Sequence, residues 1–272
     1  MDSGITKYDA ATGVAAYLIL MFDIIAIYNV MELSFMIWGG CKRHAGLYFW
    51  AFLVATYGIA AYAIGFIGKT TMSNSDAYIY LTLIEVGWIA MVTGQSMVLW
   101  SRLHFILRNP LRLRMTLWMI VSIGAICHIP TVILTYGTNA VLWGQSYSLY
   151  GTAQVTLLII QELIISGIYL SETFKLLRRG TATREPRWCG HLMQHLIVVN
   201  IVVMLLDTTI LALVYAGYYD ILASYQSFVY SAKLKLEFTI LNRLGDSQAE
   251  EKMRWSIQEV ELSTPKSADG YI

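Results

Sequence analysis

Seven stretches of this chain are long and apolar enough to cross a lipid bilayer as α-helices. A bilayer core of about 30 Å takes roughly 20 residues of helix, and little of the chain remains between these stretches. The predicted helices cover residues 13–38, 46–68, 77–101, 115–137, 148–173, 192–218 and 221–243. The sequence therefore predicts an all-α, multi-pass membrane protein, a seven-helix bundle in which residues 1–244 form one transmembrane domain.

The small share of charged residues supports this fold class. The chain is 57% hydrophobic and only 14% charged, whereas soluble domains carry about 25% charged residues. A soluble domain with a polar surface is thereby excluded. The lipid bilayer is the expected partner, and a nucleic-acid partner is not expected.

Basic residues are concentrated in every second connection, which predicts an orientation. Eleven lie in the connections after the first, third and fifth predicted helices: Lys42, Arg43, Arg102, Arg108, Arg112, Arg114, Lys175, Arg178, Arg179, Arg184 and Arg187. Only two, Lys7 and Lys69, lie before the first predicted helix or in the connections after the second, fourth and sixth. Because basic residues are retained in the cytoplasm, the N-terminus is predicted outside and the C-terminus inside, in the plasma membrane or endoplasmic reticulum. The charged tail, residues 245–272, is predicted to be cytoplasmic and disordered or a short surface helix.

Ionisable side chains occur inside several of the apolar stretches, where a charge costs roughly 2.5–3.5 kcal/mol. Those near the middle of a predicted helix are Asp23, Glu85, His128, Glu162, Asp207 and Lys233; Glu32, Lys235 and Glu237 complete the set. Six carboxyl groups thus accompany two lysines. Since they cannot all be ionised and paired, some are expected to be protonated or to face a water-filled cavity.

Helical spacing places several of these residues on common faces. In the last predicted helix one polar stripe comprises Gln226, Tyr230, Lys233 and Glu237. Lys233 can pair with Glu237 one turn away, and Asp207 on the adjoining helix is its best interhelical partner. Lys235 points about 200° away from Lys233, so we expect it to contact another helix or to reach the interface.

These residues form the candidate site. The candidate catalytic acids are Glu85, Glu162 and Asp207. The candidate binding or supporting residues are Asp23, Trp88, His128, Asn200, Tyr230, Lys233 and Glu237. No metal or cofactor is expected. Taken singly, each could instead hold helices together, and His128 alone is more typical of packing, but the number of acids at similar depth favours an internal polar cavity.

Three stretches carry a family resemblance: GQSMVLWSRLHFILRNP at 94–110, IYLSETFKLLR at 168–178 and YDILASYQSFVYSAKLKLEFTILNRL at 219–244. They resemble filamentous-fungal seven-helix membrane proteins of unknown function, which are sometimes grouped with fungal rhodopsin-like or receptor-like proteins. The resemblance implies a fungal origin and a seven-helix topology. It implies no activity.

The function favoured by the sequence is a membrane-embedded enzyme of secondary metabolism. Such an enzyme would bind a lipophilic small molecule, for example a terpenoid or polyketide, and cyclise or isomerise it by protonation. This chemistry needs a carboxylic acid kept neutral in an apolar pocket, which Glu85, Glu162 or Asp207 could supply. The face of Trp88 could stabilise a cationic intermediate.

A seven-helix receptor or sensor is the alternative. The basic connections and Arg102 at the inner end of the third predicted helix fit it, and its partner would be a G protein. The acidic residue directly before that arginine, an exterior disulfide and an NPxxY-like sequence are missing.

Proton or ion transport ranks below these two hypotheses. Carboxylates and histidine can relay protons, but no internal repeat typical of transporters is evident. A retinal protein ranks lower still, because Lys233 could form a Schiff base but position 229, one turn before it, is Val229 and not an acid.

Overall fold

The structure is a computed structural model that describes residues 3–40, 46–71, 77–107, 109–137, 144–182, 187–218 and 221–240. Its elements are α1 (Ser3–Gly40), α2 (Leu47–Thr71), α3 (Ala77–Ile106), α4 (Pro110–Gly137), α5 (Gly144–Ala182), α6 (Arg187–Ala216) and a further helix over 221–240. Six of these helices, α1 to α6, are long and apolar enough to cross a membrane. The prediction of an all-helical, multi-pass membrane protein is confirmed for this part of the chain. The predicted tail, 245–272, lies outside the described residues.

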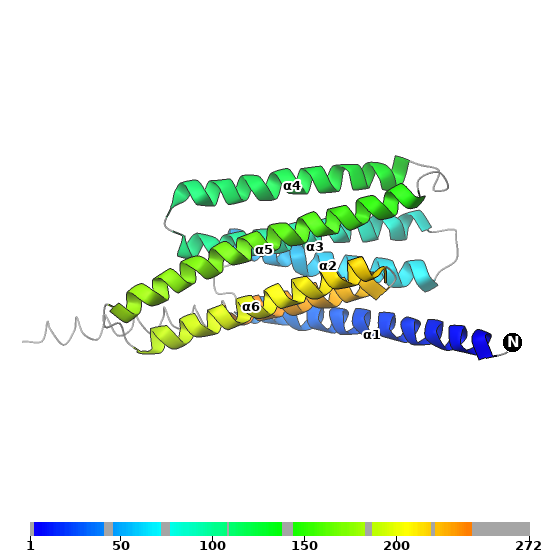
Figure 1. Cartoon of the computed structure of the whole chain (residues 1–272), viewed down its shortest axis with the longest axis horizontal. Helices are drawn as coiled ribbons and strands as arrows, with labels where there is room; N and C mark the ends of the chain where they lie inside the picture. The colour runs from blue at the N-terminus through cyan, green and yellow to red at the C-terminus, as the bar shows by residue number, and fades with distance from the viewer. Residues whose placement is uncertain are drawn as a thin grey trace, which may run out of the picture.

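The helices pack side by side along one common direction (Figure 1). Consecutive helices are antiparallel, since residue numbers fall along one helix as they rise along its neighbour. Between α3 and α4, for example, Thr82 contacts Tyr136 and Thr93 contacts His128. Contacts between α1 and the 221–240 helix instead rise together, from Asp23 with Ser224 to Asn29 with Ser231. The 221–240 helix therefore runs parallel to α1.

Most helices extend beyond the predicted apolar stretches, so those boundaries need correction. The largest changes are in α1, α3, α4 and α5, predicted over 13–38, 77–101, 115–137 and 148–173. The physical reason is that hydropathy detects only the lipid-facing part of a helix, whereas backbone hydrogen bonding continues through polar residues at its ends. At α4 the start is fixed by Pro110 in the first turn and by Asn109, whose Oδ1 accepts a hydrogen bond from Leu111 N at 3.1 Å.

One helix ends earlier than predicted, although it also begins earlier. The sequence predicts a helix to residue 218, but α6 ends at Ala216. Gly217 follows with φ +78°, a left-handed conformation that glycine adopts without a Cβ clash.

Glycines bring the backbones of α2 and α3 into direct contact. A Cβ added at Gly87 would lie 2.4 Å from the Tyr62 backbone nitrogen, and one at Gly58 would lie 2.6 Å from the Met91 nitrogen. A Cβ at Gly94 would lie 2.8 Å from the Ala55 nitrogen. Close approach of this kind is the usual role of small residues between membrane helices, where van der Waals contact replaces the hydrophobic effect.

The 221–240 helix is the most enclosed helix of the bundle. Among its residues only Thr239 is exposed, whereas α1 and α4 expose large apolar side chains such as Trp38 and Trp118. An outer helix meets lipid and must be apolar, but an enclosed one can carry polar side chains if other helices supply partners. This position explains why Lys233 and Glu237 occur in an otherwise apolar stretch.

Candidate functional site

Lys233 lies at the centre of a buried ionic cluster, and its side chain is 0% exposed. Its Nζ is 2.8 Å from Oε2 of Glu162 on α5 and also forms an ion pair with Oδ1 of Asp207 on α6. Tyr230, one turn earlier on the same helix, donates a hydrogen bond to Glu162 Oε1 at 3.1 Å. The Lys233 ammonium also lies 4.5 Å from the centre of the Tyr230 ring. We call Glu162, Asp207, Tyr230 and Lys233 the Lys233 cluster.

A second buried cluster lies one turn further along the 221–240 helix. Glu237 accepts a hydrogen bond from Gln95 Nε2 at 3.0 Å and forms a salt bridge of 3.5 Å with Arg102 Nη1, both residues being on α3. The Arg102 guanidinium lies 4.8 Å from the centre of the Tyr169 ring on α5. We call Gln95, Arg102, Tyr169 and Glu237 the Arg102 cluster. It joins α3 and α5 to the 221–240 helix.

These two clusters refine the predicted pairing of Lys233. The predicted contact with Asp207 is confirmed. Lys233 does not form the possible ion pair with Glu237. Glu237 instead pairs with Arg102, and the second acid paired with Lys233 is Glu162. A lysine between two carboxylates on two helices has better Coulombic compensation than one paired within its own helix.

A polar seam joins α1 to the 221–240 helix. Ser224 donates a hydrogen bond to Asp23 Oδ2 at 2.8 Å, and Asn29 Nδ2 donates to Ser231 Oγ at 3.0 Å. Further along, Lys235 pairs with Glu32, and both side chains are about one-third exposed. The prediction that Lys235 contacts another helix is confirmed. Asp23 is thus buried, but it belongs to this seam and lies about 14 Å along the helix from Lys233 at 1.5 Å per residue.

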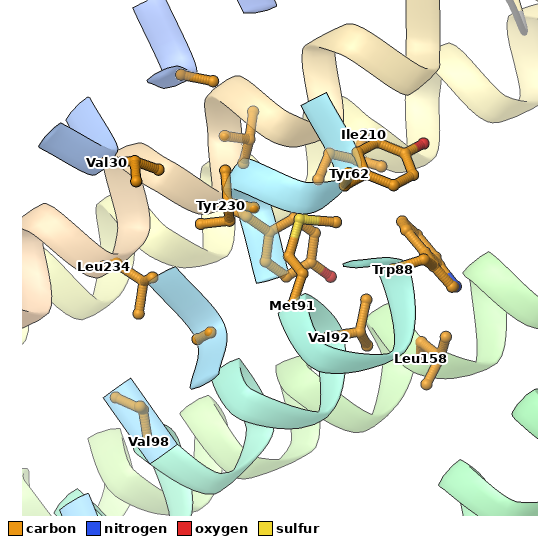
Figure 2. Packing of buried hydrophobic residues seen from close by; sticks show 14 of the residues in the cluster. Val30, Tyr62, Trp88, Met91, Val92, Val98, Leu158, Ile210, Tyr230 and Leu234 are labelled. Atoms are coloured by element: carbon orange, nitrogen blue, oxygen red, sulfur yellow. The ribbon is translucent and has the colours of Figure 1, made fainter. Parts of the chain in front are cut away.

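An apolar and aromatic layer packs around Tyr230 of the Lys233 cluster (Figure 2). The layer comprises Tyr62, Trp88, Met91, Leu158, Ile210 and Tyr230, all buried in one hydrophobic cluster. Leu158 precedes Glu162 by about one turn, and Ile210 follows Asp207 by about one turn on the antiparallel α6. The layer therefore lies toward the end of the bundle at which α1 begins, and the Arg102 cluster lies toward the opposite end. The rings of Tyr62 and Trp88 are 5.8 Å apart.

Besides Asp23 in the seam and Trp88 in the apolar layer, three predicted site residues lie outside the two clusters. Glu85 is 7% exposed, and its Oε1 has no hydrogen-bond partner among the described residues; it lies on α3 about 15 Å before Gln95. His128 on α4 contacts Thr93 at 3.3 Å. Asn200 donates to the Ser166 carbonyl at 2.9 Å and so joins α6 to α5.

Sequence analysis missed Gln95, Tyr169 and the burial of Arg102, which is only 4% exposed. The hydropathy pattern ends the third predicted helix at residue 101 and so places Arg102 in a cytoplasmic connection. A usable signal was present, since Gln95 and Arg102 are seven residues apart and share a helical face. Hydropathy could not show that this face meets Glu237.

A surface hollow lies elsewhere, near the end of α5. It has a volume of about 470 Å³ and is lined by Phe174, Lys175, Leu177 and Arg178. Within the residues that the structure describes, no three His, Cys, Asp or Glu side chains are placed to hold one metal ion. The chemistry that the two clusters offer is proton and charge exchange between carboxyl, phenol, ammonium and guanidinium groups.

Comparison with known proteins gives one match. Neither the curated proteins nor the solved structures include one that matches the chain. A match to a protein family covers residues 8–249, which include both clusters, α2 to α6, the 221–240 helix and all of α1 except its first five residues. The chain therefore belongs to the family described as a domain of unknown function, DUF7703.

Proposed function

We propose that the chain is a proton-binding membrane protein that passes protons through its helical bundle by way of the Lys233 cluster. The observation that carries this proposal is the balance of buried charges. Three carboxyl groups, of Glu162, Asp207 and Glu237, lie with two basic groups, of Lys233 and Arg102. If all five were ionised, one negative charge would remain in excess in a medium of low dielectric constant. Binding one proton removes that excess.

The proton would be shared, because neighbouring acids that interact strongly titrate as one unit. Glu162 and Asp207 meet at the same Lys233 ammonium, and Tyr230 donates to Glu162. From α2, Tyr48 and Tyr62 face the clusters. The nearest acids on α1, Asp23 and Glu32, are engaged with Ser224 and Lys235.

A route along the bundle supports transfer in addition to binding. Buried polar side chains recur on the 221–240 helix at Ser224, Gln226, Tyr230, Lys233 and Glu237. From first to last they extend about 20 Å at 1.5 Å per residue, which is two-thirds of a bilayer core of about 30 Å. Carboxylate-containing chains of this kind are typical proton relays in membrane proteins.

We further propose that the 221–240 helix is a seventh membrane span. It has the length of one at 20 residues, and it runs parallel to α1 after six changes of direction. The two ends of the bundle would then lie on opposite sides of the membrane. The distribution of basic residues favours an outside N-terminus and an inside C-terminus.

Acid-initiated chemistry on a lipophilic substrate is a second candidate, and Glu85 is the observation that favours it. Glu162 and Asp207 are both engaged by the Lys233 ammonium, so neither is free to approach a substrate alkene. Glu85 is buried beside an apolar layer, without a hydrogen-bond partner for Oε1 among the described residues. Trp88 follows it by about one turn.

Proton movement can be measured in sealed vesicles. The protein is reconstituted into liposomes that contain a pH-sensitive dye, and an interior-negative potential is applied by outward diffusion of potassium. We expect faster acidification than in protein-free liposomes, and a decrease of at least tenfold in Asp207→Asn. The matched control is Glu32→Gln, which alters a partly exposed acid outside both clusters and should leave the rate within twofold. Acidification equal to that of protein-free liposomes would refute the proposal, and so would an equal loss in both variants.

The second candidate has a different measurement. Lipid extracts of cells that produce the protein or its Glu85→Gln variant are compared for a product that depends on the protein. A product that is lost in Glu85→Gln and retained in Asp207→Asn would favour the enzyme over the proton relay.

A further inference from the structure

Several buried polar atoms between the Lys233 and Arg102 clusters have no hydrogen-bond partner among the described residues. They are Gln95 Oε1, Gln161 Oε1, Ser166 Oγ, Asp207 Oδ2 and Glu237 Oε2. All five side chains are at most 1% exposed. The three guanidinium nitrogens of Arg102 likewise make no well-formed hydrogen bond to a described residue, although Nη1 is within salt-bridge distance of Glu237. Buried polar atoms in native proteins are nearly always satisfied, if not by protein then by ordered water.

Toward Arg102, the unpaired atoms follow one another along two helices; other unpaired atoms, such as Gln226 Nε2 and Ser227 Oγ, lie beyond Tyr230 on the other side of Lys233. Ser166 lies about one turn after Glu162 on α5, and Tyr169 follows about one turn later beside Arg102. Glu237 lies one turn after Lys233 on the 221–240 helix, so both helices carry polar atoms toward the same end. A water molecule in such a path finds the two to four polar partners that it needs.

We infer that these atoms bind a chain of internal water molecules, which connects the Lys233 cluster to the end of the bundle where α3 ends. Arg102 is four residues before Ile106, the last residue of α3. The water chain therefore has only about 6 Å of helix left to the end of α3 at 1.5 Å per residue. This inference deepens the proposed function and rests on it, because it names the route by which a proton would enter or leave the Lys233 cluster.

The aromatic layer makes this access one-sided. Met91 is 0% exposed and Tyr62, Trp88 and Tyr230 are at most 9% exposed, and all four belong to one hydrophobic cluster (Figure 2). On α3, Trp88 and Met91 precede Gln95 and Arg102, so this layer lies on the side of Lys233 away from Arg102. Apolar surfaces in close contact exclude water. In the conformation described, the Lys233 cluster would thus exchange protons only toward the Arg102 end. Transfer across the bundle would require the layer to separate.

Radiolytic labelling of the unmodified protein tests for the water. Hydroxyl radicals formed from bound water oxidise neighbouring side chains even where bulk solvent is excluded. We expect rapid oxidation of Tyr169, which is 4% exposed and lies beside Arg102. Met91 serves as the matched control, because its thioether is intrinsically more reactive than a phenol but belongs to the dry layer. Oxidation of Met91 as fast as Tyr169, or of Tyr169 no faster than the buried Phe52, would overturn the inference.

Silver ions, which are similar in size to a water molecule and react with thiols, identify the accessible side. In a background with Cys41, Cys127 and Cys189 replaced by Ala, Ser166→Cys is compared with Ile165→Cys, whose side chain is equally buried but belongs to an apolar cluster. We expect silver ions added at the Arg102 end to react with the thiol of Ser166→Cys, and silver ions added at the other end not to react. The thiol of Ile165→Cys should react from neither end. Equal reaction of both variants, or reaction of Ser166→Cys from the other end, would overturn the inference. If Tyr169 is oxidised as expected but the liposomes show no proton movement, the proposed function is refuted and the water chain remains established.

Discussion

Lys233 Nζ lies 2.8 Å from Glu162 Oε2, which places an ammonium of the 221–240 helix against a carboxylate of α5. The same ammonium pairs with Asp207 on α6, so a single side chain links three helices in the interior. Such an arrangement fixes the rotation of the 221–240 helix about its own axis, because any other rotation would bury the charge without a partner. Buried charged groups cost stability unless they are paired in this way.

Replacing Lys233 with methionine should therefore destabilise the protein strongly. Lys233→Met keeps the length and apolar stem of the side chain but leaves Glu162 and Asp207 close together without a counter-charge. We expect a loss of about 3–5 kcal/mol in the free energy of unfolding, measured by denaturant titration in detergent micelles. Lys235→Met is the matched control, because the Lys235–Glu32 pair is partly exposed and should contribute less than about 1 kcal/mol. Equal losses in the two variants would contradict the assignment of Lys233 to the buried cluster.

Acid replacement should rescue the lysine variant. If repulsion between the two carboxyl groups causes the loss, then Lys233→Met combined with Glu162→Gln and Asp207→Asn should be more stable than Lys233→Met alone by at least about 1 kcal/mol. The free energy of unfolding of the triple variant gives the answer. A triple variant less stable than the single one would show that the carboxyl groups have other partners.

Arg102 and Glu237 should be energetically coupled. Arg102→Met and Glu237→Gln each leave the remaining group buried and uncompensated, whereas the double variant removes both charges at once. We expect the double variant to lose less stability than the sum of the single losses, with a coupling of about 1–3 kcal/mol. Additive losses would mean that the 3.5 Å salt bridge makes no contribution. The same cycle on Arg112 and Glu172, an exposed pair at 3.2 Å, should give a coupling below about 1 kcal/mol.

The sequence could predict the polar face of the 221–240 helix because helical periodicity alone decides which residues share a face. It could also predict Asp207 as a partner, because consecutive helices joined by a short connection lie side by side. It could not predict Glu162 as the second acid, since that depends on which face of α5 meets the 221–240 helix. Such rotations are set by packing, which periodicity within one helix does not contain.

Arg102 shows a second limit of sequence analysis. A hydropathy pattern ends a span at the first basic residue, and so the third predicted helix stopped at residue 101. The structure continues α3 to Ile106 and buries the guanidinium against Glu237 and Tyr169. Two charges, each costly alone, become tolerable when they meet. Only the three-dimensional contact identifies such a pair.

Gly87 should tolerate no side chain. A Cβ at this position would lie 2.4 Å from the Tyr62 nitrogen and 2.8 Å from its Cα, both backbone atoms that cannot move aside. We expect Gly87→Ala to separate α2 from α3 and to lower the free energy of unfolding by about 1–3 kcal/mol. Gly167→Ala is the matched control, since no atom lies within 4 Å of the added Cβ. Alanine is the better helix former, so this variant should be neutral or more stable by up to about 1 kcal/mol.

A disulfide between α1 and the 221–240 helix would test their parallel direction, on which the seven-span topology depends. Asn29 Nδ2 and Ser231 Oγ are 3.0 Å apart, so Asn29→Cys with Ser231→Cys, in a background without the native cysteines, should cross-link under mild oxidation. The matched control is Asn29→Cys with Ser224→Cys. Ser224 is opposite Asp23, about 9 Å of helix from Asn29, which is too far for a disulfide. In an antiparallel pair that crossed midway, position 29 would meet 224 instead, and the two yields measured by gel electrophoresis would be reversed.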